Sequence, residues 1–387
     1  MAIKHMATKT IGIILNGATG RIGSTQHLKN ALAPIRDEGG LPLGGDRIVP
    51  RLVLVGRDAE RLKSIAAEHN VEDWTTDLDA ALANPDGAIF FDAAATHQRV
   101  GALHKAIAAG KHIYSEKPVA GSVAEGRALL QAIEARGLKH GAVEDKQYLS
   151  GLQKLAQAVQ SGLLGRIVGF RLEFGWWVFD GVEQPCQRPS WNYKRADGGG
   201  LILDMYPHWR YVIENSLGKI SRLVTAASTA TPERIDENGQ RYPVDVEDQA
   251  ATLVQLENGA VGTILCSWAT RVRRDDLFAF QVDGERASVA ASLHHCFTQT
   301  NARTPRVAHI SIATDPGIDY RKDWDEVAAA GPYKNPYRVG WEDFIRHVVT
   351  GAPIKSSFAA GIRDVQFAEA CYRSAQEGTW VSLAELS

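Results

Sequence analysis

The tripeptide Glu116-Lys117-Pro118 has the residue types and the position that chemistry at a ligand site requires. It follows a short apolar segment, Ile113–Ser115, which predicts a strand. Pro118 lacks a backbone N–H and disfavours the helical region for Lys117, so we expect an extended lysine at the strand's carboxyl end. Ligands of open α/β sheets bind at this edge, where Lys117 can donate a proton or anchor a hydroxyl. Glu116 can tune that lysine or hold a ribose. A solvated loop lysine is the alternative when these residues are taken alone.

Asp204 and His208 form a second candidate pair, after the glycine run 198–200 and at the start of an expected helix. Because they are four residues apart, their side chains share one helix face. A carboxylate one turn from an imidazole can orient the ring and raise its basicity. A helix-capping aspartate and a hydrogen-bonded structural histidine are the alternative. Polar and aromatic residues elsewhere in this half are candidate substrate contacts: Lys146, Tyr148, Arg188, Trp191, Lys194 and Arg195.

A glycine-rich turn follows the first expected strand, Thr10–Leu15. Gly17, Gly20 and Gly23 are spaced as G-x-x-G-x-x-G between that strand and a helix. Such a turn lets a pyrophosphate approach the helix N-terminus, although a glycine-rich turn without a ligand is the alternative. The candidate cofactor contacts in this turn are Asn16, Gly17, Thr19, Gly20, Arg21 and Ile22.

The second expected strand, Arg51–Val55, bears on which dinucleotide binds. An acidic residue near this strand end would hold the 2′-OH of NAD, but Gly56 and Arg57 stand there. Arg57 can stack on adenine or meet the 2′-phosphate of NADP, or it is a surface arginine. The sequence therefore predicts NAD or NADP without choosing between them. The remaining cofactor candidates follow later strand ends: Ala94, Thr96, His97 and Glu116.

The order of the expected elements predicts an α/β fold. Strands alternate with helices over residues 10–143, which is typical of a parallel, doubly wound sheet that binds a dinucleotide. Residues 144–387 form a second α/β domain for substrate binding and oligomerisation, with alternating strands of a new sheet. Residues 1–9 are expected to be a tail, residues 24–50 to include an inserted loop, and residues 284–335 to be irregular.

The composition is that of a globular protein, with 44% apolar and 23% charged residues among 387 and a net charge of -2. This balance indicates neither a nucleic-acid partner nor a membrane surface, and no apolar run reaches the length that spans a bilayer. The four cysteines are scattered without metal-ligand spacing. We therefore expect reduced thiols, no metal and a cytoplasmic location.

These motifs together resemble the Gfo/Idh/MocA family of sugar and inositol oxidoreductases. The resemblance rests on the glycine turn, the Glu116-Lys117-Pro118 tripeptide, the Asp204/His208 pair and the C-terminal segment Trp341–Ile345. It implies a Rossmann domain followed by an α/β domain with a large open, mostly antiparallel sheet. It also implies hydride exchange between nicotinamide C4 and a secondary alcohol carbon. In that scheme Lys117 positions the substrate oxygen, His208 shuttles its proton and Asp204 orients the histidine.

Two positions depart from the family pattern. Tyr211 stands where the family often has an aspartate, three residues after the histidine, and this puts the usual polyol contacts in doubt. Ala95-Thr96 replaces the usual Pro-Asn before His97, which alters how the nicotinamide side is held.

Three functions are compatible with these features. The first is an NAD(P)-dependent dehydrogenase of a pyranose or its glycoside, with C3 as the favoured carbon. The second is an NAD-dependent glycoside hydrolase that oxidises C3 transiently, eliminates the aglycone, adds water and reduces the carbon again. Arg188, Lys194, Arg195 and Arg210 would suit an anionic sugar in that case, or they form a solvated basic loop. The third, a cofactor-binding sensor, is disfavoured by the intact Lys117/His208 pair.

The uncharged residues expected on both faces of the second sheet predict self-association. In the expected strand Gly259–Ser267 the residues on both sides are largely uncharged. An open sheet covered by helices on one face leaves the other exposed, and a large apolar patch usually marks an interface. We therefore expect a homodimer or homotetramer, as the family resemblance also implies.

Overall fold

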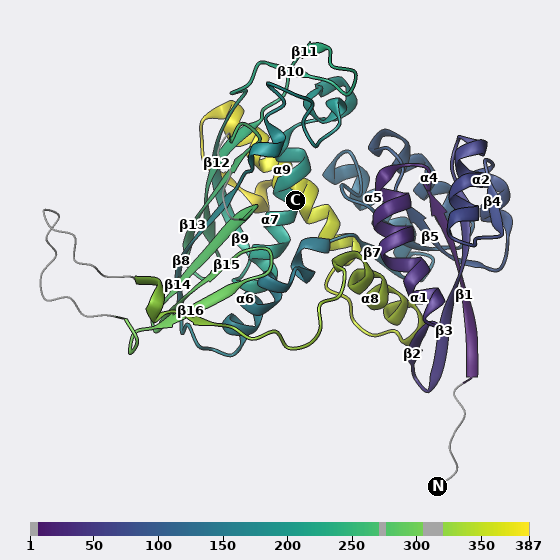
Figure 1. Cartoon of the computed structure of the whole chain (residues 1–387), viewed down its shortest axis with the longest axis horizontal. Helices are drawn as coiled ribbons and strands as arrows, with labels where there is room; N and C mark the ends of the chain where they lie inside the picture. Colours follow the sequence, from purple (N-terminus) through teal and green to yellow (C-terminus); the bar gives the residue numbers. More distant parts are fainter. Residues whose placement is uncertain (1–6, 271–275, 305–319, 387) are drawn as a thin grey trace, which may run out of the picture. The chain divides into compact units, whose positions relative to one another are not determined.

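The computed structural model describes residues 7–270, 276–304 and 320–386 (Figure 1). The chain divides into two compact units. The first comprises the described residues up to Tyr148 together with Lys334–Glu369, and the second comprises Leu149–Tyr333 and Ala370 onward. The sequence-based division at residue 143 therefore differs in two respects, because the first unit extends to Tyr148 and also includes a C-terminal segment.

The first unit is built on a mainly parallel sheet with the strand order β2-β3-β1-β5-β6-β7, in which β4 also pairs with β3. Its strands are β1 (Ala7–Asn16), β2 (Leu41–Leu43), β3 (Asp46–Val55), β4 (Asp73–Thr75), β5 (Gly87–Asp92), β6 (His112–Ser115) and β7 (His140–Ala142). Its helices are η1 (Ile22–Leu32), α1 (Ala33–Asp37), α2 (Ala59–Glu68), α3 (Leu78–Ala83), α4 (Thr96–Ala108), α5 (Val123–Glu134), η2 (Asp145–Tyr148) and α8 (Pro336–Thr350). The predicted doubly wound sheet is confirmed.

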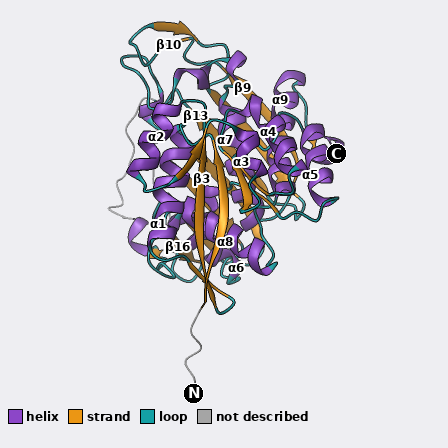
Figure 2. Cartoon of the chain, turned by 90° about the vertical axis from the view of Figure 1, so that its right-hand side faces the viewer, coloured by secondary structure: helices purple, strands orange, loops and turns teal. Residues whose placement is uncertain are grey.

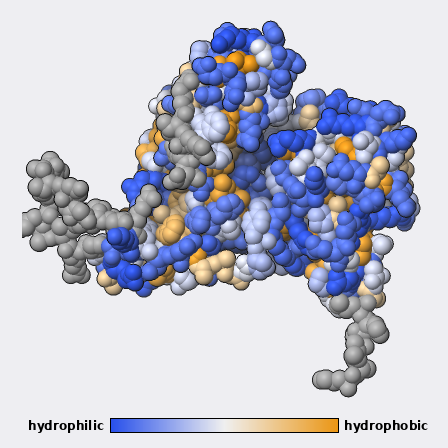
Figure 3. Space-filling view, viewed as in Figure 1, coloured by the Kyte–Doolittle hydropathy of each residue, from blue (hydrophilic) through white to orange (hydrophobic). Residues whose placement is uncertain are grey.

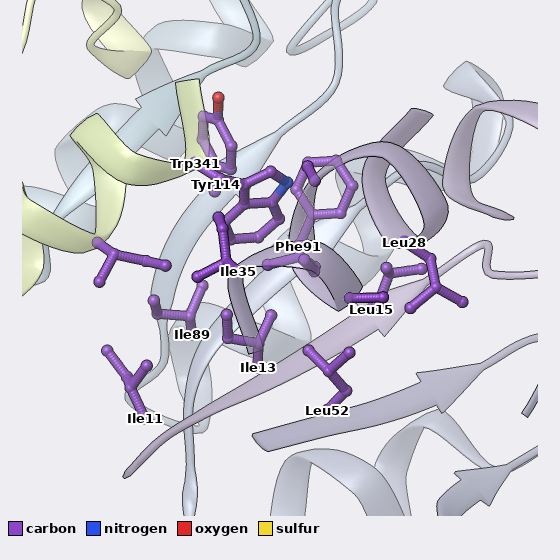
Figure 4. Close-up of a cluster of buried hydrophobic side chains, with 14 of the residues drawn as sticks. Ile11, Ile13, Leu15, Leu28, Ile35, Leu52, Ile89, Phe91, Tyr114 and Trp341 are labelled. Atoms are coloured by element: carbon purple, nitrogen blue, oxygen red, sulfur yellow. The ribbon is translucent and has the colours of Figure 1, made fainter. Parts of the chain in front are cut away.

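Alternation along β1 sends successive side chains into two cores. Ile13 and Leu15 pack with η1 and with Trp341 of α8, as Figure 4 shows. Ile14 packs on the opposite side with α3, α4, α5 and the beginning of α9 (Phe358–Glu377). Helices α2 and α3 flank β3 on its two sides (Figure 2). Residues 11–15 of β1 are buried on both faces of the sheet, and this part of the strand is a continuous apolar run.

Two sequence-based expectations for the start of the chain are wrong. Residues 7–9, expected in a tail, belong to β1, while residues 1–6 lie outside the described part. The inserted loop expected within residues 24–50 is instead the end of η1, helix α1 and an antiparallel β2–β3 hairpin. Gly44 and Gly45 both have positive φ, at 61° and 90°, as a two-residue hairpin turn requires.

The second unit is built on a mixed sheet with the strand order β17-β16-β15-β14-β8-β13-β12-β9-β18. The described pairs are antiparallel except for β8 with β13, so the expected mostly antiparallel sheet is confirmed. Its strands are β8 (Ile167–Phe174), β9 (Ile220–Ser228), β12 (Gln249–Leu256), β13 (Val261–Ser267), β14 (Phe278–Gly284), β15 (Ala287–Ala291), β16 (Cys296–Thr300), β17 (Asp325–Glu326) and β18 (Val381–Ser382). A separate small hairpin joins β10 (Glu233–Ile235) and β11 (Arg241–Pro243).

Helices α6 (Ser150–Gln160) and α7 (Leu201–Ser216) also belong to the second unit, and α9 contributes residues to both units. Short helical turns are η3 (Trp177–Phe179), η4 (Ser190–Tyr193), η5 (Arg195–Asp197), η6 (Tyr320–Asp323) and η7 (Leu383–Leu386). The expectation that residues 284–335 are irregular is wrong for β15, β16 and β17. Residues 305–319 lie outside the described part of the chain.

Hydrophobic residues are interspersed with hydrophilic ones on the face shown in Figure 3. Among the described residues, no helix combines the length and the apolar character that crossing a membrane requires. Within the same residues, no group of His, Cys, Asp and Glu side chains is arranged to hold a metal ion.

Candidate active site

The turn after β1 has the backbone geometry of a phosphate-binding loop. Gly17 has a φ of 80°, and a Cβ there would lie 2.6 Å from the Ala93 carbonyl carbon. A Cβ at Gly23 would lie 2.4 Å from the Gly17 carbonyl oxygen, so this glycine lets η1 pack closely on the turn. Gly20 is exposed, and a Cβ there would meet only the Gly17 oxygen at 3.4 Å. The turn is therefore open at Gly20, where a pyrophosphate could approach the backbone, and it fits a dinucleotide.

The end of β3 lacks the carboxylate that would hold a ribose 2′-OH. Gly56 is buried, and a Cβ there would lie 3.0 Å from Thr19 Cγ2, so a larger residue would require the Thr19 side chain to shift. Asp58 caps α2 by accepting a hydrogen bond from the Arg61 N–H at 3.0 Å. Arg57 is exposed between them. Arg57 thus follows the carboxyl end of β3, and its contact with the adenosine end of a dinucleotide stays a prediction.

Lys117 lies two residues beyond the end of β6, half-buried, and its peptide bond to Pro118 is cis. Its backbone N–H donates to Glu116 Oε2 at 3.0 Å. The other carboxylate oxygen, Oε1, lies 2.8 Å from His27 Nε2 on η1. Both oxygens of Glu116 therefore bond groups of the protein, so the structure gives this residue a supporting role in addition to the predicted cofactor contact.

The ionisation of Glu116 follows from its neighbours. Burial would raise the pKa of this carboxyl, but the hydrogen bond from His27 and the positive charges of Lys117 and Arg99 outweigh it. The pKa of Glu116 is therefore lowered from its ordinary value. The group is an ionised carboxylate at neutral pH.

A buried ion pair between Arg99 and Asp92, the last residue of β5, holds the loop that contains Lys117. Arg99 Nε donates to Asp92 Oδ2 at 2.9 Å, and both side chains are nearly inaccessible, at 3% and 0%. Arg99 also donates to the carbonyl oxygens of Pro118 at 2.5 Å and Ala94 at 2.8 Å. Asn16 donates to the second Asp92 oxygen at 2.7 Å. The ends of β1 and β5 and the Lys117 loop are thereby joined through one carboxylate.

The other predicted residues of the first unit lie near these strand ends. Thr96 and His97 form the first turn of α4, with His97 exposed. Lys146 and Tyr148 lie on η2, after β7. Lys146 Nζ donates to Asp145 at 2.5 Å, and the Tyr148 hydroxyl donates to Asp343 of α8 at 3.0 Å. Burial raises the pKa of Tyr148, so its hydroxyl stays protonated.

In the second unit, His208 is buried on α7, at 5% exposure, and its Nδ1 lies 2.8 Å from the Tyr211 hydroxyl. Tyr211 is the residue that departs from the family pattern, and sequence reasoning did not assign it to the site. Asp204 forms an ion pair with Arg188. The predicted orientation of His208 by Asp204 stays a prediction, whereas the bond to Tyr211 is a described contact.

The start of α7 is anchored by a buried carboxyl group. Glu247 Oε1 accepts hydrogen bonds from the Ile202 N–H at 2.9 Å and from the Tyr372 hydroxyl at 2.8 Å. Gly200 precedes the helix with a φ of 131°, and a Cβ there would lie 2.8 Å from that same oxygen. The glycine run therefore allows Glu247 to reach the helix start, which fixes the helix that carries Asp204 and His208. Burial raises the pKa of Glu247.

The cations predicted to attract an anionic sugar have partners within the second unit. Beyond its ion pair with Asp204, Arg188 stacks 4.9 Å from the Trp268 ring. Lys194 lies 5.1 Å over the Tyr242 ring, and Arg195 donates to the Asp245 carbonyl oxygen at 3.1 Å. Arg210 pairs with Glu214 at 3.2 Å, with both side chains buried. Trp191 is 49% exposed on η4. Arg188 and Arg210 are therefore paired with carboxylates, whereas Lys194 contacts an aromatic ring and Arg195 a backbone carbonyl oxygen.

The fold and the site together define a class. A parallel sheet with an open glycine turn after its first strand, together with a lysine beyond the end of β6, has the features of a dinucleotide-dependent oxidoreductase. Two family models match the chain: one described as an oxidoreductase family with an NAD-binding Rossmann fold covers residues 11–142, and one described as the GFO/IDH/MocA C-terminal domain covers residues 152–290.

The chain belongs to the Gfo/Idh/MocA family of oxidoreductases, and its first unit is the NAD-binding domain. D-xylose dehydrogenase of Paenarthrobacter nicotinovorans is 39% identical over 389 aligned residues, which cover 98% of this chain and 99% of that protein. Levoglucosan dehydrogenase of Pseudarthrobacter phenanthrenivorans is 25% identical, over 85% of this chain and 87% of that protein. The predicted family and enzyme class are confirmed.

Solved structures share the fold. Levoglucosan dehydrogenase in complex with NADH and levoglucosan superposes with a TM-score of 0.78 at 22% identity, over 97% of this chain and 99% of that one. An aldose-aldose oxidoreductase from Caulobacter crescentus, complexed with glycerol, gives a TM-score of 0.74 at 20% identity, over 97% and 100%. The predicted fold class, a Rossmann domain followed by an α/β domain, is confirmed.

Proposed function

We propose that this protein is an NAD(P)-dependent dehydrogenase of a neutral pyranose, with D-xylose as the first substrate to test. The observation that carries the proposal is the full-length similarity to the D-xylose dehydrogenase, at 39% identity over 98% of the chain. Lys117 at a strand end beside the cofactor turn and His208 on α7 supply the groups that alcohol oxidation needs. The carboxylate partners of Arg188 and Arg210 reduce the positive charge available to an anionic sugar, which favours a neutral one.

The reaction removes a hydride from a carbon and a proton from its hydroxyl. A nicotinamide dinucleotide bound at the glycine turn Gly17–Gly23 would supply the hydride acceptor. In this proposal Lys117 anchors the hydroxyl oxygen, and its positive charge stabilises the negative charge that develops there. His208 accepts the proton at Nε2. A neutral imidazole has one N–H donor and one acceptor nitrogen. If Nε2 accepts the proton, the single N–H must be on Nδ1, where it donates a hydrogen bond to the Tyr211 oxygen.

The structure of the product identifies which carbon is oxidised. The sequence interpretation favours C3, which would give a keto sugar. A free aldose also offers its anomeric carbon, whose oxidation gives a lactone stabilised by ester resonance. NMR of the product separates these two outcomes.

The test incubates the purified protein with NAD⁺ or NADP⁺ and a panel of neutral and anionic pyranoses, and follows the absorbance of the reduced nicotinamide. Turnover of a neutral pyranose with net cofactor reduction supports the proposal. An aryl glycoside is included for the glycosidase alternative, which releases phenol without net reduction. Phenol release alone, or turnover confined to anionic sugars, would contradict the proposal.

Arg57 is proposed to recognise the 2′-phosphate of NADP. We expect Arg57→Ala to weaken NADP binding by about ten- to a hundredfold, the range that a charge-assisted hydrogen bond supplies, and NAD binding much less. Fluorescence titration of both reduced cofactors measures this. Arg127→Ala, an exposed arginine of α5, is the control. Equal losses for the two cofactors would make Arg57 an adenine contact or a surface residue.

The second sheet is proposed to form the contact of a homo-oligomer. Alternation along β13 is observed as expected, and Val261 and Leu265 are 44% and 42% exposed. We expect light scattering to give a dimer or tetramer, and Leu265→Lys to lower the mass, because a charge in an apolar contact is costly. A mass near the 42.1 kDa of one chain for the parent would contradict this.

A further inference from the structure

A buried chain of hydrogen bonds in the first unit ends at the backbone of Lys117. The Trp341 Nε1–H donates to His27 Nδ1 at 3.0 Å. His27 Nε2 lies 2.8 Å from Glu116 Oε1, and Glu116 Oε2 accepts the Lys117 N–H at 3.0 Å. His27 and Trp341 are both 0% exposed, and Glu116 is 7% exposed. These residues come from three separate parts of the sequence.

The indole determines which nitrogen of His27 carries hydrogen. An indole N–H can only donate, so Nδ1 of His27 must be an acceptor without hydrogen. The single ring hydrogen is then on Nε2, which donates to Glu116. In the opposite tautomer, the Nε2 lone pair would face the carboxylate, and Nδ1–H would face the indole N–H. Trp341 therefore excludes the tautomer that would leave Glu116 without its donor.

Packing leaves these rings little freedom to reorient. His27 lies 4.2 Å from the Phe91 ring and 5.0 Å from the Tyr337 ring, measured between centroids. Trp341 packs at 5.0 Å from Phe91 and 4.9 Å from Tyr114, and Figure 4 shows these three rings together. The imidazole is thus enclosed by the aromatic side chains that β5 and α8 contribute.

We propose that His27 and Trp341 are positioning residues for Lys117. The indole sets the tautomer of His27, His27 holds the Glu116 carboxylate, and Glu116 holds the Lys117 amide. His27 lies on η1, the helix that follows the glycine turn. The same chain of hydrogen bonds therefore links η1 to Lys117. The kinetic part of this inference rests on the proposed function, whereas the bonding itself does not.

The substitutions that test it remove single bonds. Trp341→Phe removes the indole N–H and retains an aromatic ring. His27→Gln retains an N–H donor near the position of Nε2, whereas His27→Leu removes it. Trp74→Phe is the matched control, since Trp74 is an exposed tryptophan of β4 in the same unit. Thermal unfolding of each variant tests whether the fold is retained.

The first readout is spectroscopic and needs no turnover. In protein labelled with ¹⁵N-histidine, we expect His27 to show an unprotonated Nδ1 and a protonated Nε2. In protein labelled with ¹⁵N-lysine, the Lys117 amide signal, assigned by its loss in Lys117→Arg, should move in Trp341→Phe and stay in place in Trp74→Phe. A protonated Nδ1 at His27, or an unmoved Lys117 amide, would overturn the proposal.

The second readout is kinetic. We expect Trp341→Phe to lower kcat by about tenfold or more while the NADH dissociation constant stays within about threefold, since small misplacements of a positioned group can cost up to about a hundredfold. His27→Gln should recover at least part of the activity that His27→Leu loses. Equal activity of Trp341→Phe and Trp74→Phe would overturn the positioning role. If the parent oxidises no sugar, the proposed function fails, and the spectroscopic readout still decides on the bonding.

Discussion

Replacing Lys117 by alanine is expected to lower turnover by ~10²–10⁴-fold, the usual contribution of a proton-transfer or positioning group. The lysine lies beyond the end of β6, on the edge of the sheet where a nicotinamide is expected, and its backbone is held by Glu116. Its ammonium group would supply a positive charge to a developing alkoxide. Cofactor binding should be nearly unchanged, because the glycine turn that receives the pyrophosphate lies in another loop.

Steady-state rates with the sugar that the parent oxidises measure this effect, and NADH fluorescence measures cofactor binding. Lys105→Ala is the control, since Lys105 is an exposed lysine of α4 paired with Asp79. Activity of Lys117→Ala within a few-fold of the parent would remove Lys117 from the proposed chemistry. Loss of NADH binding would instead assign it to the cofactor.

Replacing Arg234 by methionine is expected to reduce the free energy of unfolding by about 3–5 kcal/mol, the usual cost of breaking a buried ion pair. Arg234 and Asp248 pair at 2.8 Å with both side chains at 0% exposure. Arg234 also donates to the Trp268 carbonyl oxygen at 3.2 Å and lies 4.3 Å over the Tyr193 ring. The methionine fills much of the same volume but leaves a buried carboxylate without its cation.

Urea unfolding, followed by fluorescence, gives the midpoint and the slope for each variant. Arg241→Met is the matched control, because Arg241 lies on the paired strand β11 and its bond to Glu233 joins side chains that are 59% and 55% exposed. Exposed ion pairs contribute about 0–1 kcal/mol, so this control should unfold close to the parent. Similar midpoints for the two variants would show that water enters the Arg234 site.

Sequence patterns predicted the parallel sheet well because its strands are buried on both faces. The segment Ile11–Leu15 must be apolar because its side chains pack into two cores. This apolar segment by itself predicts the strand. Strands β4 and β17 are short and largely exposed, and they left no such signal. The sequence of the β2–β3 hairpin also fits a loop, because its glycines are equally typical of both structures.

The candidate site was predictable in part for a similar reason. Lys117 and the glycine turn are local motifs with their own turn chemistry. His27 bonds Glu116, 89 residues away, and Trp341 bonds His27 across 314 residues. No local pattern encodes such a contact. The position of Tyr211, three residues from His208 on the same helix, does predict a contact between the two side chains, although the family pattern draws attention only to the missing aspartate.

The return of α8 to the first unit has a consequence for how the chain folds during synthesis. Domains generally fold as units while the chain emerges, starting from the N-terminus. Here Trp341, Phe344 and Ile345 complete a core whose other members lie before residue 148. The core of the first unit therefore stays incomplete, with part of its apolar surface exposed, until the second unit and α8 have been synthesised. A fragment that ends at residue 148 would lack these three side chains and keep that surface exposed, so the residues up to 148 do not form an independent module.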